Sequence, residues 1–511
     1  MNRNTVLAIG LSALVILVFQ FFFAPKPAPQ TETPQTATTE QAAPQASSEQ
    51  TADVQPVVIE EAAPAAEPVV LRTFDVDTNY VKYTFNDNTG NMKEAVINKY
   101  HGRDLENVGF KSGSADVFVA DVPFISVYRS DVKKSNGVTT VTFTGEQGDI
   151  VVNKVYEIKD DSYLISGKLI ITNTGDKTVS IPLSSGIGAN AVDGFESDRY
   201  SFQGPLLFDG KRLKKEKAEK VDKDLVFEKP VWVGYMSKYF MIGVEQDYDK
   251  AVMAPKNGSA SIMGAKEYKV NPGARETVEF SLFAGPKEYD LLKSYGLKLE
   301  KAIDFGIFAF IAIPMLKFLK IIYGVVQNYG VAIILLTIVI KLITFPLTQK
   351  SMVSMKKMSS LGPKMAEIKE KYKGDKEKTN QATMELYKKE GVNPLGGCLP
   401  MILQIPIFFA LYKSLLLAIE LQGAPFVLWI TDLSLKDPYY ITPVIMGGTM
   451  FLQQKMTPNT ATDELQKKIF MFMPLIFTFV FLNFPSGLVV YWLTNNILTI
   501  AQQYVINKKL A

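Results

Sequence analysis

The stretch VAIILLTIVIKLITFPLT, residues 331–348, decides the fold of the C-terminal part of this chain. It is long and apolar enough to cross a bilayer, yet it carries Lys341 near its middle. At a rise of ~1.5 Å per residue, Lys341 lies roughly 15 Å from Val331, about half of a ~30 Å hydrocarbon core. An ammonium at that depth costs about 3 kcal/mol on insertion scales, so we expect water or a polar partner beside it.

The position of Lys341 leaves two interpretations open. Lys341 lies on the wall of a water-filled cavity inside the bilayer, or its side chain extends along a tilted helix to the interface. The nearest end of the span is about two helical turns away, which favours the cavity.

The composition predicts a soluble part and a membrane part in one chain. The 511 residues are 47% hydrophobic, and the mean hydropathy of +0.07 is low for a protein made only of membrane spans. The net charge of +3 does not indicate nucleic acid as a direct partner. With one cysteine, Cys398, and one histidine, His101, the chain forms neither an internal disulfide nor a Cys/His metal cluster.

The N-terminal residues predict an anchor followed by a tether. Residues 1–24 contain Arg3 and an apolar run long enough to span the membrane, and Pro25 disfavours cleavage by a signal peptidase. We therefore expect a retained signal-anchor helix with its N-terminus in the cytoplasm. Residues 25–68 are rich in Pro, Ala, Gln, Thr and Glu, which predicts a flexible linker.

Residues 69–300 change to a period of two, with turn signals every eight to twelve residues. This pattern predicts an antiparallel β-sandwich or barrel, with strands at 80–85, 138–143, 150–158 and 163–172. The charge run at 211–223 is typical of a solvated loop or hairpin, and a basic docking site is the alternative. No paired carboxylates, metal-ligand spacing or nucleophile motif stands out, so we expect neither enzyme activity nor a cofactor or metal.

Residues 301–330 form an apolar face that Pro314, Lys317 and Lys320 interrupt. An amphipathic helix at the membrane interface is expected there, with a short spanning or re-entrant helix as the alternative. Residues 350–393 then hold eleven lysines against six acids and predict a cytoplasmic helical hairpin that breaks at Gly374. One face of this hairpin carries Met352, Met355, Met358, Leu361, Met365 and Ile368. That face packs against the partner helix, or it contacts varied apolar clients, for which flexible methionines are suited.

Four more apolar stretches follow, at 399–418, 439–452, 469–482 and 488–506. The stretch at 469–482 spans only ~21 Å as a helix, so flanking residues extend it or the bilayer thins locally. Lysines concentrate in the hairpin, before residue 469 and at the C-terminus, which places those segments in the cytoplasm. The sequence thus predicts a polytopic α-helical membrane protein with six transmembrane helices, five of them forming a core at 331–511, and a large extracytoplasmic antiparallel β-sandwich domain.

Five motifs stand in order along the chain: KLITFPLT at 341–348, VNPLGGCLP at 392–400, QIPIFFALY at 404–412, DPYY at 437–440 and FPSGLVVY at 484–491. Together they resemble the YidC/Oxa/Alb family of membrane protein insertases over essentially the whole chain, and the N-terminal anchor with a large sandwich resembles its Gram-negative form. The resemblance implies a protein of the bacterial inner membrane that inserts and helps fold membrane proteins, without nucleotide hydrolysis of its own. It implies five helices around a hydrophilic groove, open to the cytoplasm and to lipid. Implied partners are nascent membrane proteins, the Sec translocon, the ribosome, components of the signal recognition particle pathway, and the lipid bilayer.

By the same resemblance, Lys341 matches the positive groove residue that attracts a client. Many members have arginine there; lysine keeps the charge but loses the bidentate geometry. The matching places Thr337 one turn before Lys341 on the groove face, Gln404 as a polar groove residue, and Trp492 where tyrosine is often found. Ordinary helix packing is the alternative for Thr337 and Gln404, and an interfacial anchor is the alternative for Trp492.

Two other function classes remain open. An ion- or proton-coupled transporter would also retain Lys341, but the five C-terminal spans show no acidic residue to act as a relay and no inverted repeat. A membrane-anchored carbohydrate-active or binding sandwich would leave the five C-terminal spans unexplained.

Overall fold

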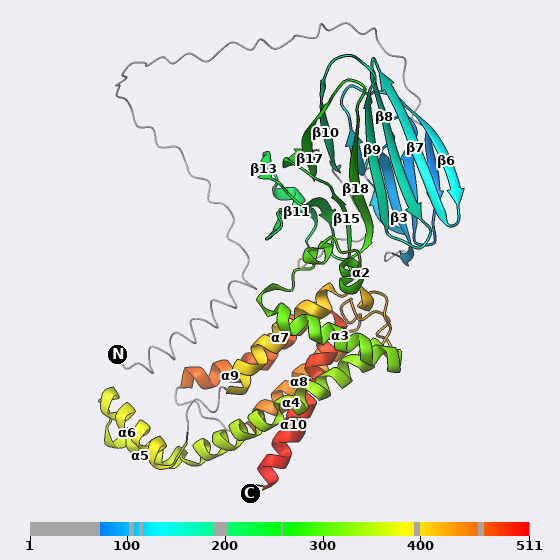
Figure 1. Cartoon of the computed structure of the whole chain (residues 1–511). Helices are drawn as coiled ribbons and strands as arrows, with labels where there is room; N and C mark the ends of the chain where they lie inside the picture. Colours follow the sequence, from blue (N-terminus) through cyan, green and yellow to red (C-terminus); the bar gives the residue numbers. More distant parts are fainter. Residues whose placement is uncertain are drawn as a thin grey trace, which may run out of the picture. The chain divides into compact units, whose positions relative to one another are not determined.

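The computed structural model describes residues 72–101, 107–111, 116–188, 202–256, 259–392, 399–457 and 464–509 (Figure 1). The predicted signal anchor at 1–24 and linker at 25–68 lie outside the described residues, and so does Cys398. The chain divides into two units, Met1–Pro68 and Val69–Ala511, and every described residue belongs to the second.

The N-terminal part of the second unit is a sandwich of two nine-stranded antiparallel sheets, which confirms the predicted antiparallel architecture (Figure 1). In spatial order, the first sheet contains β1 (Thr73–Asp77), β2 (Val81–Asn86), β3 (Met92–His101), β5 (Phe118–Asp121), β10 (Val179–Ile187), β17 (Ser259–Val270), β16 (Lys250–Lys256) and β13 (Leu225–Glu228), with β4 (Asn107–Lys111) paired to β3. The second contains β12 (Leu213–Lys215), β11 (Gly204–Phe208), β14 (Trp232–Met236), β15 (Phe240–Glu245), β18 (Arg275–Pro286), β9 (Leu164–Asn173), β8 (Ile150–Lys159), β7 (Val138–Gln147) and β6 (Tyr128–Ser135).

Alternation along the strands builds the sandwich core. In β7, Val141 and Phe143 are buried while Thr142 between them is partly exposed. Aromatic contacts join the two sheets: the rings of Phe85 and Tyr156 lie 5.1 Å apart and those of Phe118 and Phe280 5.6 Å apart. The turn between β6 and β7 uses Asn136-Gly137 with φ of 50° and 73°, the left-handed conformations that a tight hairpin requires.

Helices predominate in the described chain after the sandwich. They are α2 (Tyr289–Ser294), α3 (Ala309–Val326), α4 (Tyr329–Ser360), α5 (Gly362–Lys371), α6 (Lys376–Lys389), α7 (Leu399–Leu417), α8 (Ile441–Met456), α9 (Glu464–Phe481) and α10 (Ser486–Lys509), with short 3-10 helices η1 (Ala218–Lys220), η2 (Leu299–Ala302), η3 (Gly306–Phe308) and η5 (Ile419–Leu421). Among the described residues, Gly306–Val326 and Tyr329–Ser360 are long and apolar enough to cross a membrane, so length and hydropathy also allow α3 to span. Ile402–Leu417 and Met471–Phe481 are shorter apolar helices.

Helix α4 is longer than the predicted span, since it continues through Pro346 to Ser360. A proline inside a helix leaves a carbonyl of the preceding turn without its usual donor. Two threonine hydroxyls beside the proline bond other carbonyls of the same helix: Thr344 Oγ1 donates to that of Ile340 (2.9 Å), and Thr348 Oγ1 donates to that of Phe345 (3.0 Å).

The predicted hairpin also differs in its first arm. The methionine face is divided at Leu361 between the end of α4 and α5, where Gly362 and Pro363 begin a new helix. The second arm, α6, begins after Gly374 as predicted, and Asp375 caps it by accepting a hydrogen bond from Lys378 N (3.0 Å). Helix α9 begins at Glu464, five residues before the predicted span, so flanking residues lengthen it to ~27 Å.

Candidate functional site

Helix α10 carries a row of buried amide and hydroxyl side chains along the faces that contact α4 and α8. We name it the α10 polar row: Asn496, Thr499, Gln502 and Gln503. Steps of three and four residues place these side chains on one side of the helix. Asn496 Nδ2 donates to Thr449 Oγ1 of α8 (3.2 Å), and Gln503 Nε2 donates to Thr457 Oγ1 at its end (3.1 Å). The other two residues turn toward α4.

Lys341 meets this row from α4. Its Nζ donates to Thr499 Oγ1 at 2.7 Å, and Thr499 Oγ1 in turn donates to the carbonyl of Asn495 (2.6 Å). The lysine is half-buried, and among the described residues no carboxylate forms an ion pair with it. An ammonium offers three donors, so a single hydroxyl partner leaves it able to bind a further acceptor.

Two more contacts continue the α4–α10 seam. Gln502 Nε2 donates to Thr348 Oγ1 at 3.0 Å, and Lys356 Nζ donates to the carbonyl of Asn507 at 3.0 Å. Thr348 lies seven residues after Lys341, so both belong to the same face of α4. The seam is therefore polar over several turns between two otherwise apolar helices.

Thr337 lies one turn before Lys341, as predicted, but its side chain is buried, with 1% exposed. Its Oγ1 donates to the carbonyl of Ile333 at 2.6 Å within the same helix. This geometry matches the helix-packing alternative more closely than an open groove wall.

Gln404 and Trp492 lie on the contact between α7, α9 and α10. Gln404 Nε2 of α7 donates to the hydroxyl of Tyr491 at 2.6 Å, and Tyr491 is buried. Trp492 makes an edge contact with the ring of Phe408 (4.9 Å) and a tilted one with Phe481 (5.3 Å). Trp492 precedes Thr499 by seven residues, so the aromatic cluster and the Lys341 contact share one face of α10, ~10 Å apart.

The four methionines of the hairpin face are only partly accessible. Met352 and Met358 are buried, whereas Met355 and Met365 are partly exposed. Met358 belongs to a small core with Leu361 and Val392, against which Leu386 and Tyr387 of α6 pack. Tyr387 Oη also donates to Met365 Sδ (3.2 Å), so half of the face is directed at the second arm.

Sequence reasoning missed the α10 polar row and Tyr491. The signal was present in the predicted span at 488–506, where Asn496, Thr499, Gln502 and Gln503 recur at helical spacing. Polar side chains at such spacing in a membrane helix indicate a protein-facing or wet side. Among the described residues, no group of three or more His, Cys, Asp or Glu side chains is placed to hold a metal ion.

Two family models match the chain. The model described as "60Kd inner membrane protein" matches residues 321–511, and the model described as "YidC periplasmic domain" matches residues 73–318. The boundary between the two matches falls within α3.

Curated relatives match over their full length. A "Membrane protein insertase YidC" of Geotalea daltonii is 40% identical over 542 residues, covering 100% of both chains. A protein of the same name from Syntrophus aciditrophicus is 40% identical over 571 residues, again covering 100% of both.

Solved structures show a weaker likeness. "Active YidC insertase crystal structure with the first transmembrane domain resolved" covers 84% of this chain and 92% of that chain, with 18% identity and a TM-score of 0.37. YidC from Thermotoga maritima covers 85% of this chain and 99% of its own, with 15% identity and a TM-score of 0.30. A galactose mutarotase related enzyme from Lactobacillus acidophilus covers 42% of this chain and 97% of its own, with a TM-score of 0.32.

Proposed function

The chain belongs to the YidC family of membrane protein insertases, and we propose that it inserts transmembrane segments of newly made proteins by holding a client's acidic or polar end at Lys341. The observation that carries this proposal is the hydrogen bond between Lys341 Nζ and a neutral hydroxyl, Thr499 Oγ1. A lysine committed to a carboxylate of its own fold would have little attraction left for a client. Lys341 keeps its charge available.

The attraction is electrostatic and transient. At an effective dielectric constant of about 20, opposite unit charges ~4 Å apart attract by roughly 4 kcal/mol, less the cost of desolvating the client's carboxylate. Such a gain holds a segment briefly without trapping it. The hydrophobic part of the client then enters lipid, and each large apolar residue near the centre contributes about 0.3–0.6 kcal/mol.

The polar seam gives the client's polar end a route between helices. Thr499 and Gln502 of α10, with Thr348 of α4, offer hydroxyl and amide groups that exchange hydrogen bonds with a passing polypeptide. Gln404 on α7 and the ring of Trp492 border the same side of α10 and, in our proposal, contact the apolar part of the client.

The membrane topology belongs to the same proposal. Six transmembrane helices, the anchor at 1–24 and five in the core, place both termini in the cytoplasm of a bacterium with the β-sandwich in the periplasm. The distribution of lysines supports this orientation. Helix α3 lies along the outer interface.

The hairpin of α5 and α6 is the proposed receiving surface for clients and for delivery partners: the ribosome, signal recognition particle pathway components and the Sec translocon. The partly exposed Met365 of α5, with Met355 near the end of α4, forms the adaptable apolar part of this surface. Met352 and Met358 are buried, so they contribute packing below this surface and not contacts with a client.

Substitution of Lys341 tests the function. We expect Lys341→Glu and Lys341→Ala to reduce insertion of Sec-independent clients with acidic N-terminal segments by about tenfold or more, because ~1.4 kcal/mol of lost attraction is a factor of ten. Lys341→Arg should retain insertion, since arginine keeps the charge. The measurement is protease protection of a radiolabelled client in proteoliposomes containing only the purified variant.

The matched control is Lys350→Glu, an exposed lysine further along the same helix. Normal insertion by Lys341→Glu would refute the proposal. A transporter was the alternative function; the relatives named above are insertases and give it no support.

A further inference from the structure

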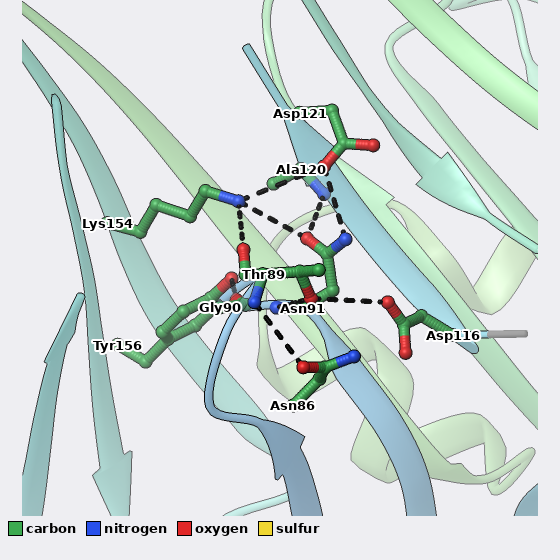
Figure 2. A network of polar contacts seen from close by, with 9 residues as sticks. All are labelled: Asn86, Thr89, Gly90, Asn91, Asp116, Ala120, Asp121, Lys154 and Tyr156. Carbon is green, nitrogen blue, oxygen red and sulfur yellow. Dashed lines mark hydrogen bonds and ion pairs between the residues drawn. The ribbon is translucent and has the colours of Figure 1, made fainter. Parts of the chain in front are cut away.

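Lys154 interrupts the apolar inner face of β8. Ile150, Val152, Tyr156 and Ile158 are buried at alternate positions of this strand, and Lys154 occupies the inward position between them with 0% of its side chain exposed. Figure 2 shows its Nζ directed at two residues of the β2–β3 turn: it donates to the carbonyl of Thr89 (2.7 Å) and to Asn91 Oδ1 (3.3 Å). Burying an ammonium costs free energy even when it has hydrogen-bond partners, so its presence at this position requires an explanation.

The ammonium fixes the side chains beyond it. Asn91 Oδ1 also accepts from Ala120 N (3.1 Å), so the amide has one orientation and its Nδ2 donates to Asp121 Oδ1 (3.1 Å) (Figure 2). Lys154 itself lies 3.9 Å from the same carboxylate oxygen. Buried groups, Asn91 and Lys154, therefore fix the orientation of the Asp121 carboxylate, while 47% of its side chain stays exposed.

This network forms one wall of a cavity of about 500 Å³ on the first sheet of the sandwich. Its polar lining includes Thr89, Asn91, Asp116, Asp121, Ser261 and Lys256. Val119, Ile125 and Met263 contribute apolar surface between them. A volume of this size suits a small-molecule ligand, and a few fixed polar groups on an apolar lining are typical of ligand sites.

Tyr128 gives an independent indication that the cavity has an occupant. It lines the cavity with 5% of its surface exposed, and its ring lies 4.2 Å from Lys154 Nζ. Among the described residues, its buried hydroxyl has no hydrogen-bond partner. Buried hydroxyls in folded proteins are nearly always paired, so this residue of the cavity lining would gain a hydrogen bond if its ring turned toward a ligand.

We propose that this cavity binds an uncharged, hydroxyl-rich ligand, namely a saccharide unit. Asp116 and Asp121 are balanced by Lys256 on the lining and by Lys154 behind it, so the site has no net charge to favour an ion. It combines carboxylate acceptors with ammonium and amide donors, and a sugar hydroxyl both donates and accepts. The apolar lining residues match the C–H faces of a sugar ring.

Calorimetric titration of the full chain in lipid nanodiscs tests this proposal, because alkyl maltoside detergents would themselves present a sugar. The probes are maltotriose and triacetylchitotriose, which distinguish a plain from an acetamido sugar, with trilysine and triglutamate as charged competitors. We expect saturable binding of at least one sugar, weakened about tenfold by Asp121→Asn and severalfold by Tyr128→Phe, since each change removes one ligand contact.

Two matched variants outside the cavity, Asp131→Asn and Tyr268→Phe, should bind as the wild type does. If Tyr128→Phe lowers the melting temperature, Ser261→Ala replaces it, because this change removes a lining hydroxyl without touching the Lys154 network. Absence of saturable binding by both sugars up to their solubility limits overturns the proposal. So does equal binding by the cavity variants, or tighter binding of either charged peptide.

Discussion

Lys341 and Lys154 are two lysines withdrawn from bulk water, and their surroundings differ in one respect that determines what each does. The Lys154 ammonium is enclosed by the carbonyl of Thr89, the amide of Asn91 and the ring of Tyr128. Its donors are occupied, so its role is to hold the β2–β3 turn against β8. Lys341 has one hydroxyl partner, Thr499. A cation with spare donors can accept a further partner, which is the role that we propose for Lys341 toward an incoming chain.

Thr499 is accordingly expected to position the Lys341 ammonium. Thr499→Val keeps the shape of the side chain but removes the hydroxyl, and we expect insertion of clients with acidic N-terminal segments to fall about three- to fivefold, the value of one interhelical hydrogen bond of ~0.6–1 kcal/mol in a membrane. Thr499→Ser should restore insertion. The measurement is the protease-protection assay used for Lys341.

Thr494→Val is the matched control for that substitution. Thr494 lies on the same helix, and its hydroxyl donates to the carbonyl of Val490 (2.8 Å). If Thr494→Val reduced insertion as much as Thr499→Val does, then removing any threonine hydroxyl from α10 would impair insertion. That result would contradict a positioning role specific to Thr499.

Lys154 makes the stability of the sandwich depend on pH. Burial lowers the pKa of Lys154 from 10.5 to about 8. The folded state therefore binds the proton less tightly than the unfolded state, and the cost of the buried charge is fully present below pH 8. As pH rises from about 8 to 10.5 that cost disappears, so the free energy of unfolding of the wild type should rise relative to Lys154→Met by up to about 3 kcal/mol.

Chemical unfolding of both proteins across this pH range, followed by tryptophan fluorescence, measures the difference. Lys250→Met, at an exposed position of β16, is the control and should show no such pH-dependent difference from the wild type. A constant difference between the wild type and Lys154→Met across the range would contradict the lowered pKa of Lys154 in the folded state.

Lys341 could be singled out from the sequence, whereas its hydrogen-bond partner could not. A lysine in the middle of an apolar span is conspicuous because of its cost alone. Thr499 and Gln502 carry no such cost, and which helix they face depends on how α4 and α10 pack. Lys154 was missed for a related reason: at an inward position of a strand, a lysine is distinguishable only once the register is known.

At the scale of elements, α8 and α9 approach each other closely at Gly447. A Cβ atom added there would lie 1.9 Å from Thr478 Oγ1 and 3.1 Å from Thr478 Cβ. Small residues permit such close contact between membrane helices, where dispersion replaces the hydrophobic effect as the source of stability. The close packing of α8 on α9 at this point thus depends on the absence of a side chain at Gly447.

Gly447→Ala should therefore force α8 and α9 apart and destabilise the protein by about 1–3 kcal/mol, the usual cost of overpacking. The adjacent Gly448 has no atom within 4 Å of the corresponding position, so Gly448→Ala should be neutral or slightly stabilising. Thermal unfolding in detergent compares the two alanine variants. Equal melting temperatures would show that the α8–α9 contact adapts freely.

Element types were well predicted and some element ends were not. The strands at 138–143 and 150–158 correspond to β7 and β8, because turn residues such as Asn136-Gly137 bound them. The end of α4 was placed too early, since Pro346 and the lysines beyond it resemble a helix terminus. In the structure the helix nevertheless continues through Pro346 to Ser360.

At the scale of the whole molecule, the distribution of lysines predicts which parts face the cytoplasm. The single natural cysteine makes this testable. In a Cys398→Ser background, we expect Asp222→Cys in the β-sandwich to react with a membrane-impermeant maleimide in intact spheroplasts. Lys373→Cys in the hairpin should react only in inverted vesicles. Labelling of both from the same side would contradict the proposed topology.

Helix α4 has a mechanical consequence of its own. Its 32 residues extend ~48 Å, well beyond a ~30 Å hydrocarbon core. Gly330, near one end, lies against the Phe426 ring, and the hairpin adjoins the other end. If this rod pivots near Gly330, Lys341 moves by roughly one-third of any displacement at Ser360, given ~1.5 Å per residue. A force applied to the hairpin by one of the partners that we propose for it would thereby shift the charged side chain sideways at the centre of the bilayer.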